Sequence, residues 1–284
     1  MDEVRIKDPD GVSIVTYVWQ PAVPRAVVQI LHGWAEHARR YDHVAAALVD
    51  AGYAVVADDH RGHGLTGIEA GGLGDLGPRG MDGVLDAVHA VTQWISTTYA
   101  GVPLFLLGHS WGSFLAQRYI EQWGDELAGV LLTGTTLRRP DDRPRAAPAA
   151  SAGASSDASS DASPEGRYDW LTRDGAEVQR YIDDPMCGFE SMQRRPPASS
   201  TFSRPSSPPD AGGTVPTRLP AFIFNGAEDR IGGHEGGHAL AEHYRALELA
   251  DVSFTSYPGA RHELFNELNR DEVIADVLAW LAAR

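Results

Sequence analysis

The sequence has a single cysteine, Cys187, among its 284 residues. One thiol cannot form an internal disulfide, and it cannot supply the cysteine pairs of a zinc ribbon or a redox dithiol. Basic residues are also scarce: 24 Lys and Arg face 39 Asp and Glu, which gives a formal net charge of -15. Such a charge repels a phosphate backbone and offers no basic patch to anionic lipid headgroups. The composition therefore argues against a nucleic-acid partner, and the lone thiol suits a reducing compartment.

Long apolar runs are absent as well. No uninterrupted run approaches the ~20 residues that a transmembrane helix requires. The N-terminal stretch MDEVRIKDPDGVSIVTYVW is acidic and alternates polar with apolar residues about a DPDG turn, unlike the basic and then apolar regions of a signal peptide. We therefore expect an N-terminal β-hairpin, no transmembrane segment and a soluble, cytoplasmic protein.

The apolar residues gather instead in short runs between helical segments. With 43% hydrophobic residues in 284, the chain can bury the core of one domain. Runs that are apolar on both faces are typical of covered parallel strands, and they occur at 26–33, 53–59, 103–110, 129–135, 220–229 and 252–260. Helical patterns separate them at 40–51, 81–99, 112–123, 236–249 and 270–283. The alternation predicts an α/β fold, with a mostly parallel twisted sheet of about eight strands and helices on both faces.

The alternation stops between residues 138 and 218. Two stretches of this region are rich in Pro, Ser, Ala, Gly and Asp and poor in large apolar residues, so we expect them to be mobile or disordered. Between them, an amphipathic pattern predicts one helix near 168–184. The chain is thus predicted to consist of a core, residues 1–137 and 219–284, and a cap insertion, residues 138–218, above the sheet.

One strand candidate ends on a serine with a glycine two positions before it and two after it, in PLFLLGHSWGS at 103–113. Gly-x-Ser-x-Gly between a strand and a helix is typical of a nucleophile elbow, in which the serine adopts a strained backbone conformation. The helix that follows directs its positive N-terminal end at the site. We therefore interpret Ser110 as a catalytic nucleophile, and we expect side chains at Gly108 and Gly112 to collide with neighbouring elements.

A serine hydroxyl requires a base within hydrogen-bond reach and a group that orients this base. In folds with such an elbow, the acid and the histidine follow the serine in loops after later strands. FIFNGAEDR ends one strand and YPGARHELF ends the last, so Asp229 is the favoured acid and His262 the base. Three other carboxylates remain as alternatives for the acid: Glu228, Asp141 and Asp142. The histidines of other loops and helices are interpreted as structural or solvated, namely His32, His60, His63, His109, His234, His238 and His243.

Further motifs resemble those of the α/β-hydrolase superfamily, and within it the monoacylglycerol lipase and lysophospholipase group, also classed with serine aminopeptidase-like hydrolases. HGWAEHARRY at 32–41 resembles H-G-x-x-E-H-x-x-R-Y, and DHRGHGLT at 59–66 resembles D-x-R-G-H-G-x-S with threonine in place of the last serine. GHSWG, GAED and a late His-Glu pair match the later motifs of the group. The resemblance implies an α/β-hydrolase fold and an oxyanion hole formed by the backbone NH groups of Trp34 and Trp111.

The segment DWLTRDGAEVQRYIDDPMCGF also resembles the cap of this group, where a helix ends in a D-P-x-C turn. In the relatives, the cap brings apolar helices to the acyl pocket, whereas here Pro- and Ser-rich stretches occupy much of that length. A less covered site favours shorter or more soluble esters over long-chain lipids.

A second motif, HEGGH at 234–238, fits H-E-x-x-H, which on a helix presents two histidines to zinc. Its two central glycines each cost about 1 kcal/mol of helix stability relative to alanine. The longer metzincin pattern also requires glycine and histidine where Ala241 and Tyr244 stand. We interpret the segment as a flexible connector, and we expect no metal and no cofactor.

These patterns together predict a serine hydrolase that cleaves carboxylic esters of the monoacylglycerol, lysophospholipid or short-chain class through an acyl-enzyme. An aminopeptidase or amidase, a thioesterase or a perhydrolase with the same triad is an alternative, because the pocket and not the triad selects the leaving group. A catalytically silent binding protein is another. The expected partners are a small ester or lipid substrate, and a membrane surface that the cap contacts transiently.

Overall fold

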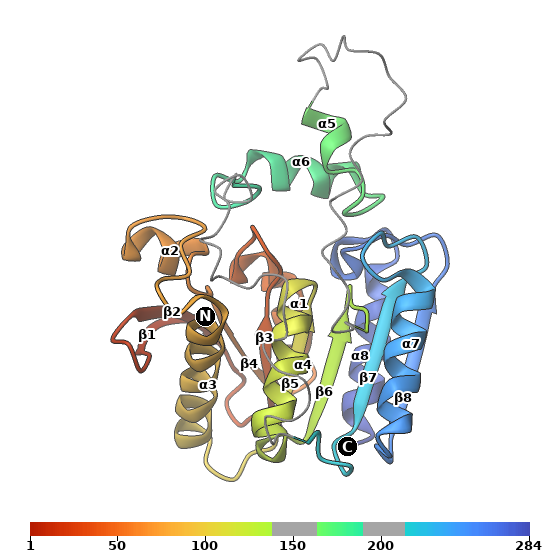
Figure 1. Ribbon diagram of the computed structural model, residues 1–284, viewed down its shortest axis with the longest axis horizontal. Coiled ribbons are helices and arrows are strands. Elements are labelled where there is room, and N and C mark those ends of the chain that lie inside the picture. The colour runs from red at the N-terminus through yellow and green to blue at the C-terminus, as the bar shows by residue number, and fades with distance from the viewer. Residues whose placement is uncertain (138–163, 190–213) are drawn as a thin grey trace.

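The computed structural model describes residues 1–137, 164–189 and 214–284, and this part of the chain contains an eight-stranded sheet (Figure 1). The strand order is β1-β2-β4-β3-β5-β6-β7-β8, and β2 alone runs against the other seven. The strands are β1 Asp2–Lys7, β2 Ser13–Trp19, β3 Ala26–Leu31, β4 Tyr53–Asp58, β5 Leu104–His109, β6 Gly129–Thr133, β7 Ala221–Gly226 and β8 Val252–Tyr257. The predicted α/β class, strand number and N-terminal hairpin are confirmed.

Helices cover both faces of the sheet. One apolar core lies between the sheet and α3, α4 and α7, and a second lies between the sheet and α1 and α8. The central strands β3 to β7 are buried along their whole length, because both faces are covered. The α-helices of the core are α1 Asp42–Asp50, α2 Gly64–Ala70, α3 Gly80–Thr98, α4 Trp111–Trp123, α7 Gly233–Ala246 and α8 Arg270–Ala282, and the short 3-10 helices are η1 Ala38–Tyr41, η2 Gly124–Glu126 and η5 Leu264–Asn266.

None of the helices in the described residues is long and apolar enough to cross a membrane. Of the six core helices, α2 was not expected from the sequence. It has seven residues, two of them glycines, so no apolar periodicity marks it. It forms because the Asp59 carboxylate accepts a hydrogen bond from the Leu65 amide at 2.7 Å, which fixes its first turn.

Residues 164–189 of the insertion carry α5 Pro164–Arg167 and α6 Gly175–Asp183 over the carboxyl ends of the strands (Figure 1). The helix predicted near 168–184 is therefore shorter than expected. Asp174 caps α6 by accepting a hydrogen bond from the Ala176 amide at 3.0 Å. The two residues before it, Thr172 and Arg173, are hydrogen-bonded to the loop after β8. The low-complexity stretches that we expect to be mobile lie outside the described residues, and the boundaries of the cap at 138 and 218 stay a prediction.

Both ends of this segment are tied to loops at the carboxyl edge of the sheet. At one end, the carbonyl of Leu171 accepts a hydrogen bond from the amide of Glu263 at 2.7 Å, and the Thr172 hydroxyl donates to the carbonyl of Asn266 at 2.8 Å. At the other end, the amide of Gly188 donates to the carbonyl of Ala35 at 2.9 Å. The segment thus spans from the loop after β8 to the loop after β3.

Candidate active site

The serine elbow lies between β5 and α4. Ser110 adopts φ 52° and ψ -119°, a left-handed φ that costs free energy in any residue with a side chain. A Cβ atom at Gly108 would lie 2.5 Å from the carbonyl oxygen of Gly112, and one at Gly112 would lie 2.1 Å from the carbonyl oxygen of Leu31. The collisions predicted at both glycines are therefore confirmed, and they show how closely α4 approaches β3. The tight turn leaves Ser110 half-buried at the carboxyl edge of the sheet.

The predicted base and acid meet at the same edge of the sheet. His262 follows β8 and Asp229 follows β7, and Nδ1 of His262 lies 2.9 Å from Oδ1 of Asp229. The same carboxylate oxygen accepts a hydrogen bond from the amide of Ile231 at 2.8 Å. Burial opposes ionisation of Asp229, but the imidazole beside it and the amide hydrogen bond hold its pKa below the usual range. Asp229 is thus a buried carboxylate that fixes the orientation of the His262 ring.

Of the three alternative acids, the structure describes Glu228, and it makes no such contact. Glu228 precedes Asp229 and its side chain is exposed. Asp141 and Asp142 lie outside the described residues. Among the carboxylates that the structure describes, Asp229 is therefore the one that the fold joins to the predicted base.

Two loops bring the predicted base and oxyanion donors to the elbow. The ring of His262 lies 4.8 Å from the ring of His109, the residue before the serine. A Cβ atom at Gly33 would lie 3.2 Å from Cβ of Ser110, so the loop after β3 packs directly against the serine. Trp34 in this loop and Trp111 at the start of α4 contact each other, with indole centroids 5.0 Å apart and planes at 90°. The two backbone amides predicted to bind an oxyanion therefore come from adjoining segments.

A buried ion-pair network joins these two loops. Arg40 donates from Nη1 to Glu36 at 2.7 Å, and it forms a two-pronged contact with Glu263, with both distances 2.7 Å. Glu36 also accepts hydrogen bonds from the Tyr41 hydroxyl at 3.0 Å and pairs with Nδ1 of His109 at 3.2 Å. Burial opposes the ionisation of both glutamates, but the Arg40 guanidinium holds their pKa values below the usual range. The network fixes the loop with Trp34 against the loop with His262.

The described part of the insertion contacts the site on two sides. The Trp170 ring lies 4.8 Å from the ring of His262, and the Phe189 ring lies 6.2 Å from that of Trp34. Tyr181 on α6 donates a hydrogen bond from its hydroxyl to the carbonyl of Ala35 at 2.9 Å. Aromatic side chains thus cover His262 and the loop of Trp34, although the sequence pattern suggested little cover.

Comparison with known proteins places this arrangement in a family. Residues 22–269 match the family model described as serine aminopeptidase, S33. The chain belongs to this family. A monoacylglycerol lipase of Mycolicibacterium smegmatis is 29% identical over 274 residues, which cover 96% of this chain and 94% of that protein. The monoglyceride lipase of Homo sapiens is 25% identical over 297 residues, which cover 100% of this chain and 91% of that protein.

A solved structure shows the same likeness. A highly thermostable carboxyl esterase of Bacillus coagulans, in complex with glycerol, superimposes with a TM-score of 0.78 at 25% identity, and the alignment covers 99% of this chain and 98% of the esterase. These matches confirm the resemblance predicted from the motifs. The protein is a serine hydrolase of the α/β-hydrolase fold, similar to monoacylglycerol lipases.

Several motif histidines of this family member form a packed group beside the site. The ring of His32 stacks on that of His60 with centroids 4.1 Å apart, and Nε2 of His32 accepts a hydrogen bond from the His60 amide at 3.0 Å. His63 packs against Trp111 with ring centroids 4.9 Å apart. Burial lowers the pKa of His63 to about 3, so this ring is neutral at physiological pH. These contacts agree with the structural interpretation of the group.

The HEGGH segment is helical, so its interpretation as a flexible connector is wrong. It forms the first turns of α7, and the rings of His234 and His238 lie 6.0 Å apart on the exposed side. Glycine is required at position 237 because a Cβ atom there would lie 2.6 Å from the ring of Phe254 on β8. The packing of the helix against the sheet therefore outweighs the low helix propensity of its glycines.

Proposed function

We propose that Ser110 is the nucleophile of this carboxylic ester hydrolase, with His262 as its general base and Asp229 as the residue that orients the base. The observation that carries the proposal is the 2.9 Å contact between His262 and Asp229, formed beside a serine held at positive φ. Nδ1 of the imidazole is engaged by the carboxylate, so Nε2 is the nitrogen available to accept a proton.

The reaction follows from this assignment. The Ser110 hydroxyl attacks the ester carbonyl while Nε2 of His262 takes the hydroxyl proton, and the amides of Trp34 and Trp111 donate hydrogen bonds to the oxyanion. The tetrahedral intermediate collapses to an acyl-serine, and the imidazolium returns the proton to the leaving alcohol. Water then attacks the acyl-serine with the same base, which releases the acid and restores the serine.

Labelling with a fluorophosphonate probe tests the nucleophile. The wild-type protein should react, and Ser110→Ala should not. Ser113 is the matched control, since it lies three residues later in α4 and donates a hydrogen bond to the carbonyl of Ser110 at 2.6 Å. Ser113→Ala should keep the label. Unchanged labelling of Ser110→Ala would refute the assignment.

For the substrate, we propose a glycerol monoester. The names of the relatives support this class: monoacylglycerol lipase, monoglyceride lipase, and an esterase solved with glycerol. The aromatic rings of Trp170 and Phe189 beside the site supply apolar surface against which an acyl chain can pack.

A graded substrate panel tests this choice. Monoacylglycerols of increasing chain length, lysophospholipids, short aryl esters and aminoacyl amides should be compared by kcat/KM, and the glycerol monoesters should lead. The family is described as serine aminopeptidase, so faster turnover of aminoacyl amides would favour the amidase alternative instead. A protein that binds these compounds but hydrolyses none of them at any pH would be a binding protein.

We also propose a cytoplasmic location and a transient contact of the insertion with a membrane surface. The single, buried cysteine suits a reducing compartment, and residues 164–189 of the insertion lie over the edge of the sheet that holds the candidate site (Figure 1). Co-sedimentation with phosphatidylcholine vesicles should fall when residues 164–189 are replaced by a short Gly-Ser linker. Equal sedimentation of both proteins would contradict the contact.

A further inference from the structure

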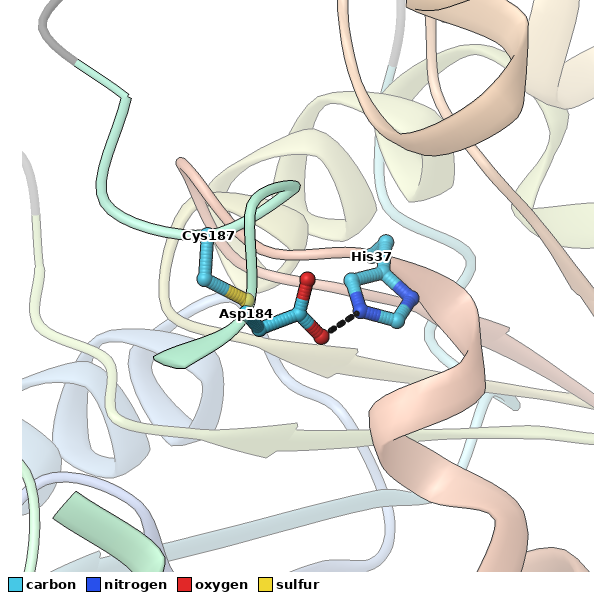
Figure 2. A group of neighbouring side chains, drawn as sticks. All are labelled: His37, Asp184 and Cys187. Atoms are coloured by element: carbon cyan, nitrogen blue, oxygen red, sulfur yellow. Dashed lines mark hydrogen bonds and ion pairs between the residues drawn. The ribbon is translucent and has the colours of Figure 1, made fainter. Parts of the chain in front are cut away.

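Three potential metal ligands from two distant parts of the chain meet where the insertion touches the core (Figure 2). His37 lies in the loop after β3, and Asp184 and Cys187 lie in the turn that follows α6. Nε2 of His37 is 2.8 Å from Oδ2 of Asp184, and one ligand atom from each of the three residues lies within 4.8 Å of the other two. We propose that His37, Asp184 and Cys187 form a zinc-binding site.

The three side chains supply a donor set that zinc accepts. Zinc binds imidazole nitrogen, carboxylate oxygen and thiolate sulfur at about 2.0–2.3 Å, in tetrahedral geometry, and sites with three protein ligands leave the fourth position to water. Tetrahedral angles at these lengths separate the ligand atoms by about 3.3–3.6 Å. The His37 and Asp184 atoms must therefore separate slightly, and the Cys187 sulfur, which lies within 4.8 Å of both, must approach them by at most about 1.5 Å, within reach of a side-chain rotation.

The backbone that carries the ligands is already fixed on both sides. The amide of Cys187 donates to the carbonyl of Asp184 at 3.0 Å, and the amide of Met186 donates to Oδ1 of the same residue at 2.8 Å. The amide of Gly188 donates to the carbonyl of Ala35, two residues before His37. Oδ1 of Asp184 is thus held by the turn, and Oδ2 faces the imidazole. Little backbone ordering remains to oppose metal binding.

Charges of both signs surround the proposed site. The Arg40 guanidinium acts most strongly on the Cys187 thiol, and the carboxylates of Asp184, Glu36 and Glu263 act against it. Burial raises the pKa of the Cys187 thiol, so without metal it keeps its proton. On binding, a zinc–sulfur bond replaces the S–H bond and the proton leaves to solvent. His37 coordinates through Nε2 in the tautomer that carries its proton on Nδ1.

The proposed site would connect the insertion to a loop of the active site. His37 follows Trp34 by three residues, whereas Asp184 and Cys187 belong to the segment that carries α6. An occupied site would therefore add a cross-link between the cover and the loop whose amide is proposed to bind the oxyanion. The exposed pair His234 and His238 on α7 is the competing surface site, and any test must separate the two.

Cobalt titration of the full-length protein, after dialysis against a chelator, tests the proposal. Co²⁺ is a spectroscopic stand-in for zinc, and thiolate ligation gives a sulfur-to-cobalt charge-transfer band. We expect one equivalent to produce this band in the wild-type protein. Cys187→Ser should abolish it, and Asp184→Asn should weaken Zn²⁺ binding at least tenfold in competition with a chromophoric chelator. The His234→Asn/His238→Asn variant is the matched control and should keep both the band and the affinity.

Three outcomes would overturn the proposal. One is the absence of the charge-transfer band in the wild-type protein at excess Co²⁺. The second is an affinity for Zn²⁺ that Asp184→Asn leaves unchanged. The third is binding that is lost in His234→Asn/His238→Asn alone. Because Cys187 is buried, the thermal midpoint of each variant should be measured without metal. If Cys187→Ser does not fold, two other measurements decide the result. These are the charge-transfer band of the wild-type protein and the Zn²⁺ affinity of Asp184→Asn.

Discussion

Replacing Arg40 by methionine tests the buried network that joins the loop of Trp34 to the loop of His262. The substitution keeps most of the side-chain volume and removes the guanidinium. Glu36 and Glu263 would then face each other inside the protein without the charge that holds both pKa values low. We expect both the free energy of unfolding and kcat to fall, because the ion pairs of Arg40 fix the loop of Trp34 against the loop of His262.

The magnitude follows from the burial of the three groups. The Arg40 side chain is 10% exposed, and its partners Glu36 and Glu263 are 3% and 5% exposed. Removing one partner of a buried ion pair costs about 3–5 kcal/mol of the free energy of unfolding, because the remaining charges stay uncompensated. A loss of this size lowers the melting temperature by about 10 °C. A loop displacement of about 1 Å would also lower kcat by roughly 10²-fold.

Urea unfolding and ester turnover measure the two effects. Arg39 provides the matched control, since it is the preceding residue and pairs with Asp42 at 2.8 Å, but both side chains are more than 40% exposed. Exposed ion pairs contribute about 0–1 kcal/mol, so Arg39→Met should change little. A loss in Arg40→Met no larger than that in Arg39→Met would show that the buried network stabilises the protein no more than an exposed ion pair does.

A double variant separates the buried charges from the packing. Arg40→Met combined with Glu263→Gln removes one of the two carboxylates that Arg40→Met leaves without a countercharge. If uncompensated charge is the cause, the double variant should be more stable than Arg40→Met alone. If lost packing is the cause, the two losses should add.

Other predictions concern single positions. Gly112→Ala should lower the free energy of unfolding in urea by about 3 kcal/mol or more, because its Cβ would lie 2.1 Å from the Leu31 carbonyl oxygen. Gly175→Ala is the control, since nothing lies within 4 Å of its Cβ, and it should change this free energy by less than about 1 kcal/mol. Asp229→Asn should lower kcat by about 10⁴-fold without a comparable loss of stability, since the imidazole loses the carboxylate that fixes its tautomer. Burial opposes protonation of His109, but the Glu36 carboxylate raises its pKa above the ordinary 6.5. The protonated ring therefore stabilises the fold fully below pH 6.5, and this stabilisation is lost as the pH rises through the folded-state pKa. In His109→Gln, the decline in melting temperature over that pH range should be absent.

Each of these has a clear contrary result. Equal unfolding free energies for the two alanine variants would mean that α4 can move away from β3 at little cost. A kcat in Asp229→Asn within tenfold of the wild type would place the orienting acid elsewhere. The same alkaline decline in His109→Gln and in the wild type would show that another group titrates in that range.

The sequence predicted the sheet well because its strands are covered on both faces. Runs such as AVVQIL in β3 and YAVVAD in β4 are wholly buried, so nearly every side chain carries the signal. Where tertiary contacts decide the local structure, the same reasoning failed. The prediction placed the helix of the insertion near 168–184, but Thr172 and Arg173 are bound to the loop after β8 and the helix begins at Gly175.

In the candidate site, too, some contacts could be predicted from the order of residues in the sequence and others could not. The chain order of serine, acid and histidine, each after a strand of a parallel sheet, was sufficient to pair Asp229 with His262. The pairing of Arg40 with Glu263 could not be inferred, because the two residues are 223 positions apart and no local pattern links them. The contact of His37 with Asp184, across 147 residues, was missed for the same reason. The motif at 32–41 contains both His37 and Arg40, but only the folded structure shows which residues their side chains contact.

The attachment of residues 168–189 at both ends has an evolutionary consequence. Hydrogen bonds from the Leu171 and Gly188 regions hold this segment to the core at both of its ends. We therefore expect selection to tolerate changes of length in the chain before residue 164 and after residue 189, because the anchored residues over the candidate site would keep their places. A protein engineer could graft a foreign peptide there for the same reason, with turnover as the check that the geometry has survived.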